Sequence, residues 1–377
     1  MSVERKRLFY LMRRGFLFWL SRKIDYPLVS PDCLQINFTF RCNLRCKMCS
    51  MHERMESFRL QNKQTELDKE TIKKLIKEAV LMGVQYLILI GGEPFLDAGI
   101  YELISYAKLC GMRGVTVVTN GTLFTEPVIG KIFESKLDNL SISIDAASEE
   151  VVAQIRGENV LQKIIDNVTM LNRMKERNKL VLPNIVCVCT IMGQNVHELM
   201  DVVGLCRRLL IPRIIFQPVV RDNTDQNRID FSSEVFVPEQ EFALLDNAID
   251  SLIEYKRSSR DNYDFIANSI PHLKLIKKYF RRALKAGELP CYSGFNRIQV
   301  VQEGKIYFCV NQSEHEAVIG NMDTDRLKEV WFSKKARRLR KLIRTCAYPC
   351  LQWCAYRDEF IEMSDIRERS RLFENRP

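Results

Sequence analysis

The sequence predicts an α/β fold of six successive βα units, followed by a smaller region rich in cysteine. Between residues 34 and 220, short runs of β-branched residues alternate with amphipathic segments, a pattern typical of a parallel sheet. Glycine and polar residues follow several of these runs, where parallel sheets bind their ligands. We therefore expect a partial, TIM-like (β/α)6 barrel or an open twisted sheet.

Six short runs give the predicted strands, at residues 34–39, 86–90, 115–118, 140–144, 185–191 and 214–217. The first long helix is predicted to begin after Asp68 as N-cap and to stop at Gly83. A further helix ends near Gly111. The apolar face of the first long helix is expected to be Ile72, Leu75, Ile76, Ala79 and Val80.

Length and composition set the class of protein. The chain has 377 residues and 57 Lys and Arg against 47 Asp and Glu, a formal net charge of +10. This excess either favours acidic partners such as phosphates, anionic lipid or nucleic acid, or simply keeps the protein in solution. Of these partners, nucleic acid is not expected. Thirteen cysteines without a secretory signal fit metal ligation in a reducing cytoplasm better than a disulfide framework. We expect a cytoplasmic protein.

Residues 1–24 predict a basic amphipathic helix. Arg13 and Arg14 interrupt an apolar stretch that is already too short to span a bilayer. The helix either packs on the body of the protein or makes a weak contact with an anionic membrane surface. Packing is favoured, because Phe9 and Phe18 broaden the apolar stripe. That stripe, expected to face inward, is Leu8, Leu11, Met12, Phe16, Trp19, Leu20 and Ile24.

Three cysteines follow the first predicted strand in the stretch FTFRCNLRCKMC. Cys42, Cys46 and Cys49 have the spacing C-x3-C-x2-C. Three thiolates on one loop indicate a metal site, because thiolate sulfur is preferred by iron–sulfur clusters and by zinc. In a four-iron cluster, three protein ligands leave one iron open. The alternative is a structural zinc ion whose fourth ligand is His52. A zinc site would not explain the glycine and polar residues that follow the other strands.

Other notable residues follow the next strands. The second strand runs into Gly91-Gly92-Glu93-Pro94, where glycine lets a backbone approach closely and proline removes a donor. Asn120 follows the third strand, and Ser143 and Asp145 lie two positions apart on one face of the fourth. Each is ordinary turn chemistry by itself. Their common edge indicates a ligand site.

The cysteine loop after the first strand and the GGEP motif after the second resemble the radical S-adenosylmethionine (radical SAM) superfamily. The resemblance implies that Cys42, Cys46 and Cys49 hold a [4Fe-4S] cluster, whose open iron binds S-adenosylmethionine. It further implies reductive cleavage to a 5′-deoxyadenosyl radical, which abstracts a substrate hydrogen. An external one-electron donor, such as flavodoxin or ferredoxin, is implied as a partner.

The resemblance also implies which residues contact S-adenosylmethionine. The GGEP edge is expected to receive the amino group, and the backbone at Met48 to lie near the adenine. Ser143 and Asp145 are expected near the ribose or carboxylate, and Arg156 near the carboxylate. The implied cofactor-binding residues are Met48, Gly91, Gly92, Glu93, Pro94, Asn120, Ser143, Asp145 and Arg156.

A second cysteine group lies near the C-terminus. Cys291, Gly304 and Cys309 satisfy C-x12-G-x4-C, with residues 298–301 and 305–308 as a predicted hairpin. A predicted basic helix at residues 327–343 precedes three further cysteines in CAYPCLQWC. These further cysteines are Cys346, Cys350 and Cys354.

This group is similar to the SPASM and twitch auxiliary-cluster domains of radical SAM enzymes. Five cysteines, rather than the seven of SPASM, imply the shorter twitch form with one auxiliary [4Fe-4S] cluster, and so two clusters in the chain. The favoured ligands are Cys291, Cys309, Cys350 and Cys354, with Cys346 as a substitute. A zinc hairpin is the alternative. The other cysteines lie among apolar neighbours as small hydrophobes: Cys33, Cys110, Cys187, Cys189 and Cys206.

The expected organisation therefore has five parts. The bridge between barrel and auxiliary domain contains predicted helices at residues 238–256 and 272–285. The parts are an N-terminal basic helix at 1–30, a radical SAM partial barrel at 31–230, a helical bridge at 231–290, a SPASM/twitch-type domain at 291–356 and a charged tail at 357–377.

The resemblance allows two hypotheses about the substrate class. We expect oxidation or epimerisation of a small metabolite such as a sugar, an aminocyclitol or a nucleotide-linked sugar, because positive charge suits a phosphorylated substrate. The alternative is modification of a ribosomally made peptide or a protein side chain. A hypothesis of another class is a non-catalytic iron–sulfur or zinc scaffold, which predicts no cleavage of S-adenosylmethionine.

Overall fold

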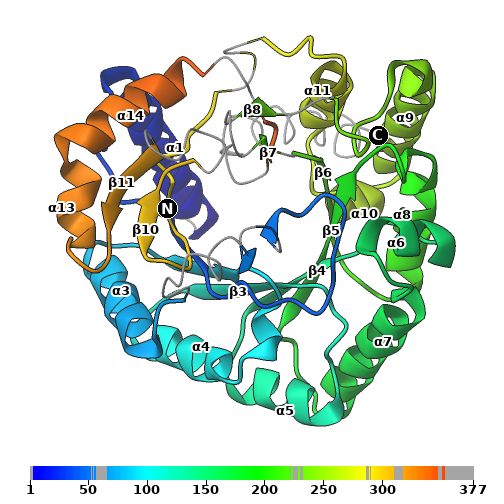
Figure 1. Cartoon of the computed structure of the whole chain (residues 1–377), viewed down its shortest axis with the longest axis horizontal. Coiled ribbons are helices and arrows are strands. Elements are labelled where there is room, and N and C mark those ends of the chain that lie inside the picture. Colours follow the sequence, from blue (N-terminus) through cyan, green and yellow to red (C-terminus); the bar gives the residue numbers. More distant parts are fainter. Residues whose placement is uncertain are drawn as a thin grey trace.

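The structure is a computed structural model. The part of the chain that it describes comprises residues 3–51, 53, 55–56, 66–220, 222–223, 228–229, 232–285, 288, 290–309, 317–346 and 350–352. Figure 1 shows a curved sheet with helices on its outer side, among them α4 (Gly99–Leu109), α5 (Glu126–Glu134) and α7 (Leu161–Arg177). The arrangement is the partial α/β barrel predicted from the alternating pattern.

Six parallel strands lie side by side in chain order, from β1 to β6 at one edge of the sheet. The register pairs Cys33 with Tyr86 and Cys187 with Ile214, so no strand is skipped along this row. All six strands are confirmed, with ends within two residues of those predicted. They are β1 (Cys33–Asn37), β2 (Tyr86–Ile90), β3 (Gly114–Thr119), β4 (Asn139–Ser143), β5 (Asn184–Ile191) and β6 (Ile214–Pro218).

The helices between these strands cover the convex side of the sheet. In α3, Asp68 is the N-cap and accepts a hydrogen bond from the Thr71 backbone N–H at 2.9 Å, as predicted. Its buried residues match the predicted apolar face, except that Val80 is only partly buried. These helices are α3 (Lys69–Leu81), η1 (Pro94–Leu96), α4 (Gly99–Leu109), α5 (Glu126–Glu134), α6 (Glu149–Arg156), α7 (Leu161–Arg177), η2 (Val196–Glu198) and α8 (Leu199–Arg208).

The C-terminal hairpin continues the same sheet. Its strands are β9 (Arg297–Val300) and β10 (Lys305–Tyr307), paired antiparallel as predicted, with Gly304 at a φ of +80° in the turn. β9 also pairs in parallel with β1, and β11 (Val318–Asn321) pairs with β10. Within the described residues the sheet therefore has nine strands, in the order β11-β10-β9-β1-β2-β3-β4-β5-β6. The sequence pattern had not indicated this continuity.

The helices after β6 differ from the predicted ones in their ends. The helix expected at 238–256 begins with a 3-10 turn and ends at Ser258. The helix expected at 272–285 begins at Ile270, because Ser269 caps it through the His272 backbone N–H, and it ends at Phe280. The elements here are β7 (Asp222–Asn223), β8 (Arg228–Ile229), η3 (Glu239–Glu241), α9 (Phe242–Ser258), α10 (Arg260–Phe265) and α11 (Ile270–Phe280).

The prediction of a single basic helix at 327–343 is wrong. The structure has two helices, α13 (Leu327–Phe332) and α14 (Lys334–Arg344). Ser333 lies between them with extended backbone angles (φ −64°, ψ 156°), and its hydroxyl accepts a hydrogen bond from the Ala336 N–H at 3.0 Å. A side chain that caps a new helix ends the preceding one at this position.

The N-terminal helix α1 (Val3–Ile24) packs on the body of the protein, but not through the predicted face. Phe18 is fully buried against Tyr292 and Phe295, and Arg14 forms an ion pair with Asp32 at 2.5 Å. Four side chains of the apolar stripe predicted to face inward are exposed, and Leu20 is partly buried. Met12 is 56% exposed, Phe16 55%, Ile24 43% and Trp19 41%.

The reason for this reversal is that polar contacts orient α1. Arg14 donates to the Ser30 carbonyl as well as to Asp32, and Arg22 donates to the carbonyls of Cys291 and Arg344 at 3.0 and 3.2 Å. Apolar periodicity alone does not reveal such arginine contacts. Among the described helices, none combines the length and the apolar character needed to cross a bilayer.

Candidate active site

The cysteine loop leaves the carboxyl end of β1 and is attached to its surroundings by backbone hydrogen bonds. The Lys47 N–H donates to the Ile155 carbonyl of α6 at 2.9 Å, and the Cys49 N–H donates to the Cys46 carbonyl at 3.0 Å. Cys42 and Cys46 are partly buried and packed against the main core, whereas Cys49 is exposed. The loop therefore presents its thiols at the rim of the sheet while its backbone is held.

Burial changes the acidity of two of these thiols. It raises the pKa of Cys42, and it raises the pKa of Cys46 to about 11, although the nearby guanidinium of Arg156 acts in the opposite direction. A buried thiolate needs a positive charge beside it, which is the condition that metal binding meets.

The three thiols do not converge on one point. Within the described ranges, no three His, Cys, Asp or Glu side chains lie close enough together to hold one metal ion. A structural zinc site needs four donors at about 2.0–2.3 Å from one centre. An iron–sulfur cubane instead takes each thiolate on a different iron. Both groups use thiolate ligands, and His52, the fourth donor of the zinc alternative, lies outside the described residues.

Gly91 and Gly92 allow the loop after β2 to lie against the start of the cysteine loop. A Cβ added at Gly92 would be 2.2 Å from the Arg41 carbonyl oxygen, and one at Gly91 would be 2.5 Å from the Thr39 oxygen. The backbone N–H groups of Gly92 and Glu93 donate to these same two oxygens at 2.7 Å. The close approach that glycine permits here is to the chain's own backbone.

Glu93 connects the ends of β2 and β3. Its carboxylate is fully buried and accepts hydrogen bonds from the backbone N–H groups of Phe95 (3.1 Å) and Asn120 (2.8 Å) and from the Thr119 hydroxyl (2.9 and 3.0 Å). Burial raises the pKa of Glu93, and these hydrogen bonds oppose the rise. Pro94 begins the 3-10 turn η1 directly after it and is also buried.

Asn43, inside the cysteine motif, binds the loop after β3. The Asn120 side chain donates to the Asn43 Oδ1 at 2.9 Å, and Asn43 donates to the Thr122 hydroxyl at 2.9 Å. Asn120 also accepts from the Thr122 backbone and hydroxyl at 2.9 and 2.7 Å. Sequence reasoning missed Asn43 and Thr122. Their signal was an Asn between two cysteines and the polar TNGT stretch after a strand.

Asp145 and Arg156 form a buried ion pair beside the cysteine loop. Asp145 is 2% exposed and Arg156 5%. The Asp145 carboxylate accepts from Arg156 and, at 2.8 Å, from the Thr190 N–H, while Arg156 Nη1 lies 3.8 Å from the Cys46 sulfur. Burial would lower the pKa of Arg156, but Asp145 and Cys46 together raise it above its ordinary value. Arg156 is therefore cationic and lies between a carboxylate and a thiol.

The structure brings most of the predicted cofactor residues to one edge of the sheet. Ser143 ends β4 and is partly buried, and Met48 is partly buried against the main core. The side chains of Glu93 and Asp145 are engaged within the protein, so their direct partners are the chain's own groups. The edge therefore combines thiols, one buried guanidinium and backbone from three strand ends.

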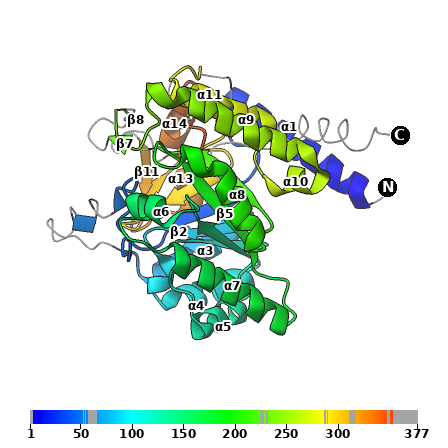
Figure 2. The same cartoon turned by 90° about the vertical axis from the view of Figure 1, so that its right-hand side faces the viewer.

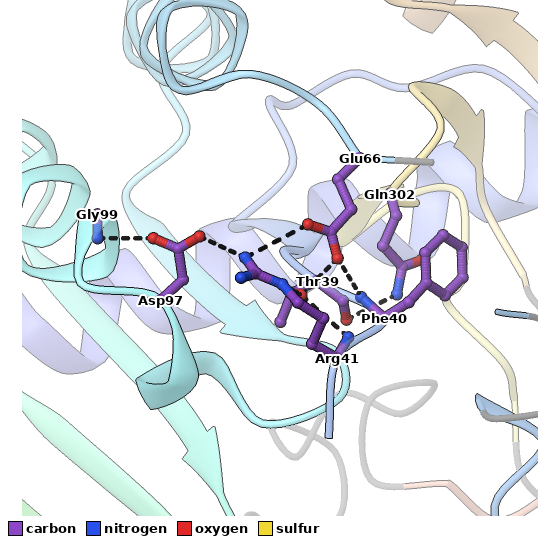
Figure 3. Close-up of polar contacts among 7 residues, drawn as sticks. All are labelled: Thr39, Phe40, Arg41, Glu66, Asp97, Gly99 and Gln302. Carbon is purple, nitrogen blue, oxygen red and sulfur yellow. Dashed lines mark hydrogen bonds and ion pairs between the residues drawn. The ribbon is translucent and has the colours of Figure 1, made fainter. Parts of the chain in front are cut away.

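A polar network links this edge to the C-terminal hairpin (Figure 3). Glu66 accepts from the Thr39 hydroxyl at 2.5 Å and from the Phe40 N–H at 2.8 Å, and Arg41 pairs with both Glu66 and Asp97. From the hairpin, the Gln302 amide donates to the Thr39 carbonyl at 3.1 Å. None of these partners was predicted, because they lie far apart in the sequence.

The second cysteine group is described for Cys291, Cys309, Cys346 and Cys350, all partly buried, while Cys354 lies outside the described residues. These four thiols are not close enough together to hold one metal ion. The choice among the five cysteines as ligands therefore stays a prediction.

The chain after Cys350 is bound to the edge of the barrel. Gln352 donates to the Pro218 carbonyl at the end of β6 at 2.9 Å. The His272 ring lies 3.3 Å from the Leu351 carbonyl and 2.8 Å from the Asn268 amide. Burial lowers the pKa of His272 to about 4, so this ring is neutral at pH 7.

A cysteine loop at the end of the first parallel strand, a glycine turn at the end of the second and a cysteine-rich hairpin define an iron–sulfur protein. The family model described as the radical SAM superfamily matches residues 36–230, more than half of the chain. The protein therefore belongs to the radical SAM superfamily. The SPASM model, described as an iron-sulfur cluster-binding domain, matches residues 291–356.

Curated relatives include GTP 3′,8-cyclases. One from Aquifex aeolicus is 26% identical over 324 residues, covering 84% of this chain and 93% of the relative. Another, from Lactiplantibacillus plantarum, is 32% identical over 172 residues, covering 45% of this chain and 49% of the relative. The first match extends across almost the whole relative, and the second across about half of it.

Solved structures with the same fold include two proteins at low sequence identity. SuiB from Streptococcus suis, bound to its precursor peptide SuiA, has a TM-score of 0.61 at 16% identity and covers 88% of this chain and 71% of its own. The protein anSMEcpe with bound AdoMet has a TM-score of 0.60 at 14% identity and covers 91% and 98%. At such identities the likeness establishes the fold alone.

Proposed function

We propose that this protein cleaves S-adenosylmethionine reductively and uses the resulting radical to remove a hydrogen atom from a small phosphorylated or nucleotide-linked metabolite. The reaction proposed is an oxidation or an epimerisation. The observation that carries the substrate class is the match to a GTP 3′,8-cyclase over 93% of that relative's length, since a cyclase of that name acts on a nucleotide. The net charge of +10 agrees with an anionic substrate.

Cys42, Cys46 and Cys49 are the residues proposed to hold the cluster. When bound, a [4Fe-4S] cluster of low potential supplies the electron that splits S-adenosylmethionine into methionine and a 5′-deoxyadenosyl radical. Cys291, Cys309, Cys350 and Cys354, with Cys346 as substitute, are proposed for the auxiliary cluster of the SPASM-type region. Sulfur donors in this number fit iron–sulfur chemistry, which uses thiolate ligands.

The neighbouring side chains keep the cysteine loop in place. Arg156 lies 3.8 Å from the Cys46 sulfur, and a guanidinium there stabilises negative charge on a thiolate. Asp145 holds Arg156 in position, and Asn43 holds the loop against Asn120. Because Glu93, Asp145 and Arg156 are at least nine-tenths buried, bulk water is excluded from the inner side of the site.

S-adenosylmethionine itself is proposed to lie along the rim formed by the ends of β2 to β4. Gly91 to Pro94 and Met48 offer backbone groups there, and Asn120 and Ser143 lie at the ends of the next two strands. Asp145 and Arg156 are proposed to act mainly by positioning the cysteine loop, because they form an ion pair with each other. The electron is proposed to come from a flavodoxin or ferredoxin.

The experiment is an anaerobic assay of the reconstituted protein with S-adenosylmethionine and dithionite. Nucleotide sugars, sugar phosphates, aminocyclitols and nucleotides are added separately, and short peptides form a parallel series. We expect a phosphorylated or nucleotide-linked compound to increase formation of 5′-deoxyadenosine, and a deuterated form to transfer its label into that product. Stimulation by peptides alone would replace the small-molecule proposal with a peptide-modifying one.

A further inference from the structure

The exposed face of α1 is an apolar stripe at helical spacing. We call Met12, Phe16, Trp19 and Ile24 the α1 face; their exposed fractions lie between 41% and 56%. Phe16 and Trp19 stack with their ring centroids 5.7 Å apart, and the Lys23 ammonium lies 5.8 Å from the Trp19 ring centroid. Large apolar side chains grouped in this way mark a binding surface more often than single exposed ones do.

The opposite face of α1 is fixed to the protein, so the exposed stripe cannot simply rotate inward. Phe18 is completely buried, and Arg14 and Arg22 bind the body through Asp32 and the Cys291 carbonyl. The orientation of the α1 face toward solvent is thus a property of the folded protein.

Charge around the α1 face is of one sign. Between Arg5 and Ile24 the sequence has seven Arg and Lys residues and no Asp or Glu. Arg13 and Lys23 are exposed on or beside the face. The next acid in the sequence, Asp25, is paired with Arg344 of α14 at 2.9 Å.

The surface continues from α1 onto α14. Tyr26 and Phe332 are both exposed and their ring centroids lie 5.9 Å apart. α14 then adds exposed cations to the apolar positions Phe332 and Leu342. These exposed cations are Lys334, Lys335, Arg337, Arg338 and Lys341.

We propose that the α1 face binds the surface of an anionic phospholipid bilayer, with its apolar side chains in the interfacial layer and the cations of α1 and α14 against lipid phosphates. Trp and Tyr favour the boundary between acyl chains and water, and Lys and Arg reach phosphate from that depth. A second copy of the chain fits less well, because a two-fold contact through this face would bring like-charged helices together. This surface is additional to the proposed catalytic function.

The placement leaves the candidate active site accessible. Figure 2 shows α1 extending beyond the body on the side opposite β7 and β8. Because β7 follows the carboxyl end of β6, the active-site edge lies on the side away from the N-terminal end of α1. A substrate or an electron donor can then reach the site while the protein is bound to lipid.

The test is flotation of the reconstituted full-length protein with vesicles of phosphatidylcholine, with or without phosphatidylglycerol. We expect binding that is at least about tenfold tighter with phosphatidylglycerol. The double variant Phe16→Ser/Trp19→Ser should lose about tenfold or more in apparent affinity, because apolar insertion is removed. Arg13→Glu/Lys23→Glu should abolish the preference for phosphatidylglycerol.

Matched controls come from other exposed positions of the same protein. Leu81 and Leu109 are even more exposed, so Leu81→Ser/Leu109→Ser should bind vesicles as the natural protein does. Lys74→Glu/Lys77→Glu on α3 changes net charge as much as the α1 charge variant and should weaken binding less than threefold. Iron content checks that each variant is folded.

Equal losses in the controls, or no binding to either vesicle, would overturn the proposal. So would a dimer in light scattering that Phe16→Ser/Trp19→Ser dissociates in the absence of lipid binding. In that case the α1 face is a contact between two copies of the chain.

Discussion

The two cysteine regions are held in different ways. The first, from Cys42 to Cys49, lies on one loop whose neighbours from β2, β3 and α6 hydrogen-bond to it directly. The second group has Cys291 before β9, Cys309 after β10 and the other cysteines after α14, and its last segment is bound to the barrel through His272 and Gln352. The first region lies on one loop at the end of β1, whereas the second combines a hairpin that continues the sheet through β9 with a final segment held by side chains.

The interior of the second region has its own centre of packing. Arg340 is 1% exposed, and its guanidinium lies 5.6 Å from the ring centroid of Phe295, 4.7 Å from that of Phe308 and 4.5 Å from that of Trp331. It donates to the Gly294 and Trp331 carbonyls at 2.7 and 2.8 Å. A buried cation among aromatic faces can fix the orientation of the aromatic side chains around it.

The largest expected loss of stability comes from breaking the buried pair of the first region. Arg156→Ala leaves the Asp145 carboxylate buried without its cation and should cost about 3–5 kcal/mol in the free energy of unfolding. The measurement is the urea midpoint of the reconstituted protein, followed anaerobically by circular dichroism. Lys69→Ala, which removes one half of a pair that is roughly half exposed, should cost less than about 1 kcal/mol. Equal effects would contradict the assigned burial.

Replacement of one glycine tests the contact between the two loops of the first region. Gly92→Ala places a Cβ 2.2 Å from the Arg41 carbonyl oxygen, so the backbone must shift, at a cost of about 3 kcal/mol. Gly130 in α5 has open space around its Cβ position, so Gly130→Ala should be neutral or stabilise by up to about 1 kcal/mol. If both variants unfold at the same urea concentration, the close approach at Gly92 is absent.

The pH dependence of stability tests the docking of the second region through His272. The pKa of His272 is lowered to about 4 in the folded protein, whereas an unfolded histidine titrates near 6.5. Below about pH 6.5 the unfolded chain binds a proton that the folded protein does not, so stability falls as the pH falls toward 4. Between pH 7 and pH 5 this amounts to roughly 2 kcal/mol.

His272→Gln removes that titration. The difference in the free energy of unfolding between pH 7 and pH 5 should therefore be smaller in the variant by the same amount. Because the clusters themselves respond to acid, the comparison is between the natural protein and the variant at each pH, with iron absorbance recorded. His197→Gln, at an exposed histidine, serves as control and should leave the slope unchanged. An unchanged slope in His272→Gln would contradict the burial of this ring.

The smallest effect is expected at the contact between the two regions. Gln302→Leu removes the hydrogen bond to the Thr39 carbonyl, but that carbonyl still accepts from Gly92. The variant also removes a buried amide oxygen that has no partner among the described residues. The two effects offset each other, and the free energy of unfolding from urea denaturation should change by less than about 1 kcal/mol. A larger loss would show that Gln302, rather than the β9–β1 ladder, joins the regions.

The strands and the first cysteine region could be predicted from sequence because their signals are local. Alternating β-branched runs marked β1 to β6, and the cysteine spacing with the GGEP turn marked one edge of the sheet. The family assignment confirmed that interpretation.

The features that sequence missed depend on contacts between distant residues. The pairing of β9 with β1 joins residues more than 260 positions apart, and the polar network at Glu66 crosses three loops. The orientation of α1 was wrong because Arg14 and Arg22 bind the body, so the apolar stripe remained outside. The sequence predicts one helix where the structure has α13 and α14. The helical spacing of apolar residues does not reveal that Ser333 ends the first helix and caps the second.

The measurement that tests the central claim most directly compares the natural protein with the Cys42→Ala/Cys46→Ala/Cys49→Ala variant after anaerobic reconstitution. The natural protein should contain about eight irons per chain and form 5′-deoxyadenosine from S-adenosylmethionine and dithionite. The variant should retain about four irons and form none. Retention of about eight irons by the variant, or zinc without iron in the natural protein, would contradict the account.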